Sequence, residues 1–492
     1  MMLFALLAPA YAGDFMDIWV TSSLQDGNLR AGPEAQSPMI NFVTRGTSTF
    51  FENYESRFTA DVSQSYLVLY RKDEGFSKNV FTEAAMVLRF APYVNPNDSS
   101  PGVKIQDDGS YVRIGYKIGG ADDHLLTFTG YAVDANRFRL GYSYDLTWGG
   151  RDIFAFDPSV APGVRFQWQK GPTYVFAGAK TALGDYTDPE TTMKEEQAYW
   201  GALIGGGTVI ADIVRLDLGA GSFEQGQILN IEDVTSELYA SPINAIGGCA
   251  QIGVRTNKGM DWSTSNELKL YRNAPDFVKD TYISHRQVDG VGLLVQAEGN
   301  YLAHNLLDFD NTDSTVVETA FAGDVQATVG IGTTEIGADF VYKDLSYILF
   351  DVPGLTSGYS MPDSYDVTPQ IYGRLRASHF FPKARVAPQV GIGLMQPATY
   401  GDPDNGYFVV RDETDRSHVP QGQAPAALLS GLAGVQWDVS KSMVAVGEVL
   451  YTVDNNVSDF ASTEEGEPGE YVPAPETWRN QIGVNLMVRA RF

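Results

Sequence analysis

Histidine and carboxylate side chains are the first groups in this sequence that could do chemistry, as proton donors, proton acceptors or metal ligands. Two of the 5 histidines have acids nearby in polar stretches, which gives the pairs His304 with Asp308 and Asp310, and His418 with Asp412 and Asp415. Neither stretch has the H-x-x-x-H spacing of a metal site, and the chain has no G-x-S-x-G elbow and no phosphate-binding glycine loop. Isolated histidines in polar loops are mostly solvated. We therefore expect no catalytic residue, no metal ligand, no cofactor and no enzyme.

Arginine side chains form the second candidate set. A guanidinium stays charged at any pH and binds a carboxylate or phosphate through two parallel hydrogen bonds. Most of the candidates occupy polar positions in segments where polar and apolar residues alternate; they are Arg57, Arg89, Arg113, Arg137, Arg139, Arg374, Arg376, Arg489 and Arg491. Such arginines either line a pore and set its ion preference, or pair with acids on neighbouring strands and brace them. Candidate partners for the second role are Asp61, Glu83, Asp217 and Glu267.

The segment Trp478–Phe492 shows which elements position these side chains. Its apolar face would carry Ile482, Val484, Leu486, Val488, Ala490 and Phe492, and its polar face Gln481, Gly483, Asn485, Met487, Arg489 and Arg491. Because side chains alternate across a strand, the pattern predicts a β-strand with one apolar and one polar, cationic face.

This segment resembles the closing strand of a bacterial outer-membrane β-barrel, a family in which a terminal Phe or Trp belongs to the assembly signal. The residues that fit the polar-x-Gly-x-x-apolar-x-apolar form of that signal are Gln481, Gly483, Leu486 and Val488, followed by the terminal Phe492. The resemblance implies recognition by the barrel-assembly machinery. It also implies location in the outer membrane of a Gram-negative bacterium, in contact with outer-membrane lipids and lipopolysaccharide.

The same alternation recurs along the chain, with Arg137–Tyr144 as its clearest example. The other segments are Phe58–Tyr70, Val80–Phe90, Val164–Trp168 and Phe321–Val329. Apolar residues facing outward and polar residues facing inward are typical of transmembrane barrel strands.

Loop lengths sort into two classes, as barrel topology requires. The tight connections are Val133–Asn136, Gly171–Pro172, Gly207–Ala211, Asn257–Asp261, Asp289–Gly290, Gly330–Thr334, Phe381–Lys383 and Asp438–Lys441. The long, polar ones are Thr147–Ala161, Leu183–Glu196, Glu224–Asn244, Ala303–Ser314, Asp344–Asp366, Gln396–Ala424 and Asp454–Thr477.

These features predict an all-β fold, a transmembrane antiparallel up-and-down barrel with short periplasmic turns and long extracellular loops. We count about 20 strands, within a range of 18–20 and with 16 still compatible. If the last strand runs toward the periplasm, the first rises from near Ser56, and the candidate arginines gather at the periplasmic end of the lumen.

Composition sets further limits. A net charge of −26 excludes a nucleic-acid binder, and its acids are concentrated in the long loops. The single cysteine, Cys249, excludes an internal disulfide framework. No run approaches the roughly 18 apolar residues of a membrane helix.

Three regions follow from these patterns. Residues 1–12, with Ala10-Tyr11-Ala12 as a small-residue cleavage pattern, are expected to be the remnant of a signal peptide. Residues 13–55 are expected to form an N-terminal periplasmic arm or a lumen plug. Residues 56–492 are expected to form the barrel.

A barrel of 16 or more strands leaves an aqueous lumen unless something fills it. The sequence therefore predicts a porin-like channel for passive diffusion of small hydrophilic solutes, with anionic solutes as the narrower expectation. Its candidate constrictions are Gln396–Ala424, Asp344–Asp366 and Ser22–Tyr54. The alternatives are an export conduit for an anionic polysaccharide and a plugged structural or adhesion barrel. The oligomeric state stays open.

Overall fold

The computed structural model describes residues 16–30, 62–94, 101–107, 109–135, 138–141, 146, 148–149, 159–188, 191, 193–229, 231, 236–260, 262, 288–349, 358–402, 404–411, 416–419, 422–461 and 470–492. Among these residues, no helix is long and apolar enough to cross a membrane. The main sheet has 19 strands, all of them antiparallel to their neighbours. They are β1 (Asp17–Asp26), β2 (Val62–Ser77), β3 (Val80–Val94), β4 (Pro101–Asp107), β5 (Tyr111–Lys117), β6 (His124–Tyr131), β7 (Ser159–Lys170), β8 (Thr173–Thr187), β9 (Lys194–Ile210), β10 (Val214–Gln227), β11 (Pro242–Arg255), β12 (Val288–Leu307), β13 (Thr315–Gly332), β14 (Thr334–Lys343), β16 (Gln370–His379), β17 (Val386–Gln396), β21 (Leu428–Trp437), β22 (Met443–Val453) and β25 (Asn480–Arg491).

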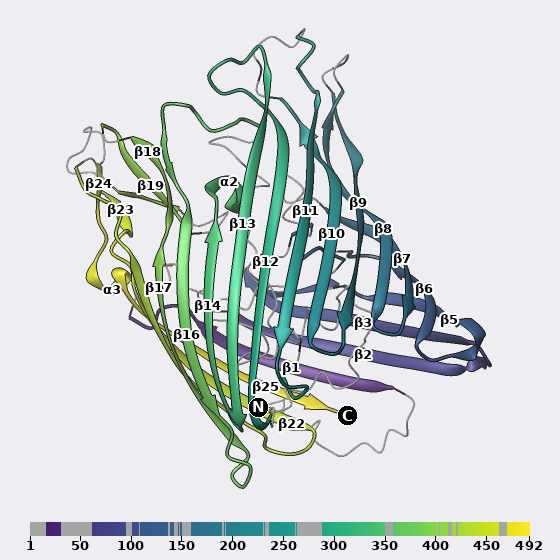
Figure 1. The fold of residues 1–492 in the computed structure, drawn as a ribbon. Coiled ribbons are helices and arrows are strands. Elements are labelled where there is room, and N and C mark those ends of the chain that lie inside the picture. Colours follow the sequence, from purple (N-terminus) through teal and green to yellow (C-terminus); the bar gives the residue numbers. More distant parts are fainter. Residues whose placement is uncertain are drawn as a thin grey trace.

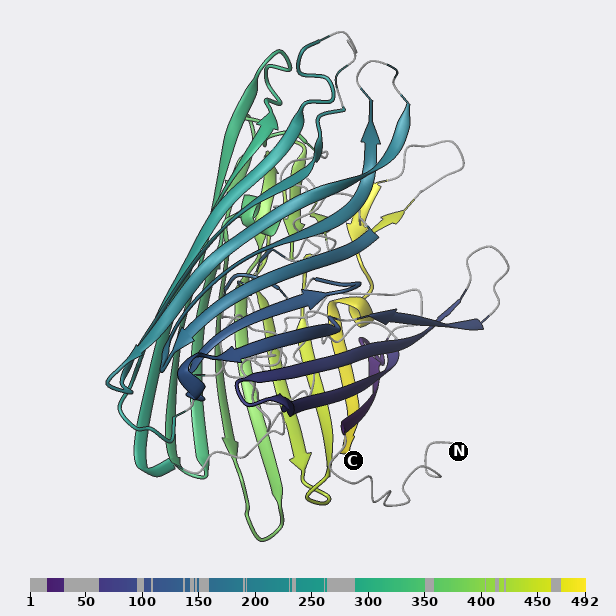
Figure 2. The same cartoon turned by 90° about the vertical axis from the view of Figure 1, so that its right-hand side faces the viewer.

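Eighteen of these strands close into a ring, which Figures 1 and 2 show from two sides. Closure is made by β1, which pairs with β2 on one edge and with β25 on the other. The count agrees with the expected range of 18–20 and is below our count of about 20. A closed ring leaves no open sheet edge, so every wall strand has hydrogen-bonded neighbours on both sides.

β4 is the strand outside the ring, and it continues the line of β5 along β3. Leu88 of β3 pairs with Asp107 of β4, and Ala85 of β3 pairs with Tyr111 of β5. At the break, the Asp107 carboxylate accepts hydrogen bonds from the backbone N–H groups of Gly109 and Ser110, each at 3.1 Å. The two strands therefore form one interrupted line.

The two faces of the wall differ as the sequence predicts. In β25, Leu486 is 59% exposed, whereas Gln481 and Arg489 are 0% and 3% exposed. The same holds on other strands, where Leu218 and Ile392 are 63% and 54% exposed. The ring therefore presents apolar side chains outward and encloses polar ones, the reverse of a soluble barrel.

The connections differ between the two ends of the ring. One end, called here the short-turn end, has the connections 78–79, 118–123, 171–172, 211–213, 333, 380–385 and 438–442, with 256–287 as its exception. The opposite end, called the loop end, has 27–61, 95–100, 132–158, 188–193, 228–241, 308–314, 344–369, 397–427 and 454–479. Figure 1 shows the short turns between β13 and β14 and between β16 and β17 at the bottom.

The first strands correct three of our expectations. Asp17–Asp26 belongs to the wall as β1, although residues 13–55 were expected to form an arm or plug. β2 then runs from the loop end to the short-turn end, opposite to the rising strand expected from near Ser56. The turn expected at Val133–Asn136 falls in the long 132–158 connection. The segments 1–12 and 31–61 lie outside the described residues.

Small elements occupy the loop end. They are a four-stranded sheet of β15 (Asp366–Thr368), β18 (Ala398–Asp402), β19 (Gly406–Val410) and β20 (Arg416–Val419), a pair of β23 (Ser458–Ala461) and β24 (Glu470–Pro473), and the helices α2 (Leu345–Ile348) and α3 (Glu476–Arg479). The 3-10 turn η2 (Ile118–Gly120) lies at the short-turn end. α2 packs against the four-stranded sheet through an apolar cluster that includes Leu345, Ile348, Tyr400 and Val410.

Candidate functional site

The candidate site is the lumen, meaning the space that the ring encloses and that the buried faces of its strands line. The inward faces of β11 to β13 show its character, with Gln251, Gln296, Glu298, Asp324, Gln326 and Thr328 all less than 9% exposed. Strand alternation places each of these side chains on the inner face, since their neighbours in sequence point outward. The lining is polar and charged.

Arg113 is the centre of one network in this lining. Its Nη1 donates to Glu83 Oε1 at 3.0 Å and its Nε donates to Thr129 Oγ1 at 3.0 Å. Tyr111 Oη donates to the same Glu83 oxygen at 2.7 Å. Glu83 and Arg113 are 4% and 9% exposed, so this is an enclosed ion pair between neighbouring strands.

Arg374 and Arg376 lie beside acids of the adjacent strand β14. Arg374 Nε is 3.9 Å from Asp339 Oδ2, and Arg376 Nε is 4.0 Å from the same atom. Arg376 Nη1 also lies 3.5 Å from Glu335 Oε1. Both arginines therefore sit against carboxylates that offset their charge.

The remaining candidate arginines are spread more widely than expected. Arg491 pairs with Asp17 at 3.1 Å and lies over the Trp19 ring, on the seam where β25 meets β1. Arg489 is on the inner face of β25, toward the short-turn end. Arg89 lies in the part of β3 nearer the loop end, because β3 runs upward, so its expected position at the opposite end is wrong. Arg139 lies inside the ring rather than in its wall, and Arg57 and Arg137 lie outside the described residues.

Arg215 and Arg165 are buried cations that the sequence did not single out. Arg215 Nε donates to Asp217 Oδ2 at 2.5 Å, and Tyr174 Oη donates to the other oxygen of Asp217 at 2.7 Å. Arg165 is 1% exposed and lies over the Phe138 ring. Both occupy inward-facing positions in the alternating pattern of their strands. A search for arginines at such positions on every strand could therefore have found them.

Part of the β6–β7 connection folds into the lumen. This inward segment, defined by Phe138–Gly141, Leu146, Trp148 and Gly149, is held together by a two-hydrogen-bond bridge between Leu140 and Trp148. Phe138, Leu146 and Trp148 are each 0% exposed. The expectation of a wall strand over Arg137–Tyr144 is therefore wrong for the described part of that range.

Polar side chains of the wall and of α2 hold the inward segment by its backbone. Lys180 of β8, 2% exposed, donates from Nζ to the carbonyl oxygens of Phe138 at 3.1 Å and Gly149 at 2.5 Å. Asn300 of β12 and Tyr347 of α2 both donate to the carbonyl oxygen of Leu146, the latter at 2.7 Å. Three separate elements therefore fix the segment, and α2 shows that part of Asp344–Asp366 also turns inward.

Glycines on the inner face of the wall make room for the inward segment. A Cβ at Gly178 would lie 2.6 Å from the Phe138 ring, one at Gly219 would lie 2.7 Å from Leu140, and one at Gly247 would lie 2.9 Å from the Trp148 ring. Contacts this short do not occur between packed atoms. The three positions must therefore be glycine to leave room for the apolar side chains of the inward segment. The inward segment thus packs against the wall from β8 to β11.

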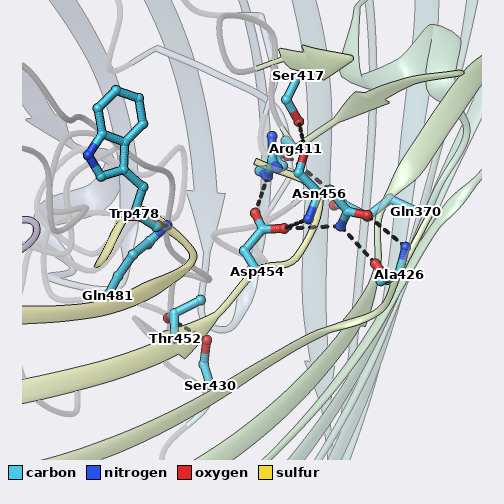
Figure 3. Close-up of polar contacts among 10 residues, drawn as sticks. All are labelled: Gln370, Arg411, Ser417, Ala426, Ser430, Thr452, Asp454, Asn456, Trp478 and Gln481. Atoms are coloured by element: carbon cyan, nitrogen blue, oxygen red, sulfur yellow. Dashed lines mark hydrogen bonds and ion pairs between the residues drawn. The ribbon is translucent and has the colours of Figure 1, made fainter. Parts of the chain in front are cut away.

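A second network, drawn in Figure 3, joins the loop end of the wall to two long connections. Arg411 Nε donates to Asp454 Oδ2 at 2.6 Å, and the other Asp454 oxygen accepts from the backbone N–H of Asn456 at 2.9 Å. The Asn456 side chain exchanges two hydrogen bonds with the backbone of Ala426. The connections 397–427 and 454–479 are thereby fixed to each other.

His304 makes its described contact with an amide rather than with Asp308 or Asp310. His304 is 0% exposed on the inner face of β12, where its Nδ1 contacts Gln225 at 3.0 Å, while Asp308 accepts hydrogen bonds within its own turn. His418 packs between the rings of Phe408 and Tyr471. Asp412 and Asp415 lie outside the described residues. Within the described part of the chain, no cluster of three or more metal-ligating side chains occurs.

Comparison with known proteins adds little. No protein-family model matches the chain, and no curated protein matches it. Similar solved structures include the outer membrane protein opdK from Pseudomonas aeruginosa, with a TM-score of 0.47 and 7% identity over 97% of this chain and 98% of that one. OccAB2 of Acinetobacter baumannii gives 0.48 and 6% over 98% and 99%, and OmpT of Vibrio cholerae gives 0.34 and 8% over 97% and 96%. At these values the likeness carries no argument, and the function must be argued from the geometry.

Proposed function

We propose that this protein is an outer-membrane channel through which small hydrophilic solutes diffuse passively. One observation carries the proposal: a closed ring of 18 strands turns apolar side chains outward and encloses charged and polar ones. A ring of this strand number is wide enough for an aqueous path.

The outer face supports a location in a membrane. Ile114, Val390, Ile392 and Leu394 are each more than 50% exposed, and similar side chains follow on neighbouring strands. Moving a fully exposed side chain of this kind from water into an apolar surrounding is favourable by about 1.5–3 kcal/mol, and roughly half of that applies to each of these half-exposed side chains. Lipid supplies that surrounding, and a closed ring satisfies all backbone hydrogen bonds of the wall within it.

The direction of the barrel follows from its connections. Short turns face the periplasm and long loops face outward in bacterial barrels, so we place the short-turn end in the periplasm. β25 ends at that side with Phe492, whereas Gln481 lies near the loop end. The barrel-assembly machinery would recognise Gln481, Gly483, Leu486, Val488 and Phe492 together as one signal along the strand. Lipopolysaccharide would surround the loop end.

Solutes would enter at the loop end and pass the inward segment. Lys180, Asn300 and Tyr347 hold that segment in the lumen, so it would set the narrowest part of the upper path. No step in such diffusion needs a reaction or a cofactor. Selectivity would follow from pore width and from the charges on the wall.

A preference for anions, the narrower expectation, has weaker support than the channel itself. Arg113, Arg374, Arg376 and Arg491 each lie within 4.0 Å of a carboxylate, as expected for residues that brace neighbouring strands. Such pairs offset much of the positive charge. The preference stays a prediction, as does the export of an anionic polysaccharide.

Single-channel recording tests the proposed function. The purified full chain, refolded in detergent and added to a planar lipid bilayer, should give stepwise openings, and heat-denatured protein should give none. A folded barrel that inserts and stays silent would contradict the proposal and favour a plugged structural or adhesion barrel.

A further inference from the structure

The connection between β11 and β12 is the exception among the short turns, and its first residues turn back into the ring. Met260 N–H donates to the carbonyl oxygen of Asn257 at 3.0 Å, which reverses the chain. Met260 is 0% exposed and Trp262 is 9% exposed. The sequence predicted a tight hairpin turn at Asn257–Asp261, whereas β11 and β12 are joined by the longer connection 256–287, whose described first residues turn inward.

Three inward-facing glycines form the socket that receives these two side chains. A Cβ at Gly292 would lie 2.6 Å from Met260 Cγ, and one at Gly330 would lie 2.9 Å from Met260 Sδ. A Cβ at Gly253 would lie 2.8 Å from the Trp262 ring. Gly292 pairs with Gly330 near the short-turn end, whereas Gly253 pairs with Gln296 farther along β12. Trp262 therefore reaches deeper into the lumen than Met260.

Arg255, the last residue of β11, ties this part of the chain in place. Its guanidinium donates to the carbonyl oxygen of Met260 at 2.8 Å and to that of Asp212 at 2.8 Å. The guanidinium also lies 4.6 Å from the centre of the Trp262 ring, a cation–π contact. Below it, Lys258 Nζ donates to Asp212 Oδ2 at 2.5 Å, and this contact lowers the pKa of the Asp212 carboxyl.

The residues Met260 and Trp262 are held in place differently from the inward segment of the loop end. There, wall side chains hold backbone carbonyls from the side; here, Arg255 holds the chain from below while an apolar cluster of Met260, Trp262, Val288 and Leu294 fills the corner. Val209 of β9 packs against that cluster from across β10 and β11. The cluster thus covers the inner wall from β9 to β13 at this level.

We propose that Met260 and Trp262 form a second constriction of the lumen, at its short-turn end, with Arg255 as the residue that positions it. This inference rests on the proposed channel function. It makes Trp262 a determinant of the size of solute that can leave the barrel. The upper and lower constrictions would act in series.

The test uses conductance of the full chain in planar bilayers. Trp262→Ala and Met260→Ala remove the constricting side chains, and Arg255→Gln releases the chain that carries them. Each should raise single-channel conductance by roughly 1.5-fold, since a pore conducts in proportion to its open area. Trp262→Phe keeps a ring beside Arg255 and should stay close to wild type.

Lys258→Ala is the matched control, because the Lys258 side chain is 76% exposed and pairs with the exposed Asp212 carboxylate rather than with Met260 or Trp262. It should leave conductance unchanged. Folding of each variant is checked by the heat-dependent shift of its band in gel electrophoresis, and any one of the first three variants that folds is decisive.

The outcomes separate the two proposals. If wild type conducts and a folded Trp262→Ala, Met260→Ala or Arg255→Gln barrel conducts equally, the constriction is refuted and the channel stands. If wild type is silent and these variants conduct, the constriction is supported and passive diffusion through the native barrel is refuted. Silence of every folded form overturns both.

Discussion

Gln389 and Glu448 are hydrogen-bonded at 2.9 Å although a whole strand, β21, runs between them. Gly434 of β21 pairs with Gln389 of β17 on one side and with Glu448 of β22 on the other. A Cβ there would lie 2.7 Å from Gln389 Nε2 and 3.2 Å from Glu448 Cγ. Glu448 also accepts from Asn485 at 2.8 Å, so one carboxylate joins β17, β22 and β25.

Gly434→Ala should break this cross-strand hydrogen bond. The new methyl group would displace the Gln389 amide, and loss of a hydrogen bond to a charged group should lower the free energy of unfolding by about 1.5–3 kcal/mol. Urea unfolding in detergent, followed by tryptophan fluorescence, measures the change. Gly431→Ala on the same strand is the control, since its Cβ would meet only the Gly391 carbonyl oxygen, at 3.9 Å. Equal stability of the two variants would show that the bond contributes nothing.

Ile392→Arg tests whether the outer face meets lipid. Ile392 lies near the middle of β17 and is 54% exposed. An arginine at the centre of a bilayer should lower the free energy of unfolding by about 2–4 kcal/mol, whereas the same change on a soluble surface would cost little. Folding into lipid vesicles is the measurement. Glu195→Arg, at the exposed loop-end tip of β9, should fold like wild type; a similar result for Ile392→Arg would argue against a membrane wall.

Lys180→Met should loosen the inward segment. It removes the donor to the carbonyl oxygens of Phe138 and Gly149 while keeping the side-chain length. We expect larger and noisier single-channel currents, because a less restrained segment blocks the upper lumen less. Lys194→Met, exposed at the tip of β9, should leave the traces unchanged. Currents identical to wild type would mean that Lys180 does not set the position of the segment.

Asp339→Asn tests the charge balance of the lumen wall. Removing this carboxylate takes away the negative charge that lies 3.9 Å from Arg374 and 4.0 Å from Arg376, while Glu335 stays 3.5 Å from Arg376. The reversal potential under a salt gradient should therefore shift toward anion preference. Asp313→Asn, in an exposed turn at the loop end, should not shift it. No shift in Asp339→Asn would place these arginines away from the ion path.

Phe492→Ala tests the assembly signal. Phe492 follows β25 and exchanges two backbone hydrogen bonds with Ile18, at 2.9 and 3.2 Å. We expect less folded barrel in the outer membrane at equal synthesis, while refolding of the purified variant in detergent changes little, since the backbone bonds remain. Met487→Ala serves as a comparison on the other face of β25. If the Phe492→Ala variant reached normal levels in the outer membrane, Phe492 would not be part of an assembly signal.

The sequence was informative where alternation alone determines the structure. The faces of β25 follow from Leu486 and Val488 against Asn485 and Arg489, because period-two patterns specify a strand with two unlike sides. The short connections at Gly171–Pro172 and Asp438–Lys441 follow from turn residues that break that pattern.

The same reasoning failed at Phe138–Leu140, where Arg139 separates two apolar residues just as in a wall strand. Alternation shows that a segment has two faces but does not identify what each face meets. Here Phe138 and Leu140 meet Gly178 and Gly219 on distant strands, and nothing in a single sequence pairs those glycines with those side chains. The arginines and carboxylates were likewise evident in the sequence as residue types. Which arginine pairs with which carboxylate depends on strand register, and alternation alone does not determine that register.

The seam between β1 and β25 makes the wall continuous through Ile18 and Phe492, residues from opposite ends of the sequence. The first and last strands of the ring are therefore neighbours, and the ring is closed by hydrogen bonds at this seam instead of by a covalent connection. A short peptide joining the two strands, with new ends opened at Gly171–Pro172, would give a circular permutant with the same order of strands around the ring. The lumen would keep its lining, and the last strand to close the wall would become β7 instead of β25.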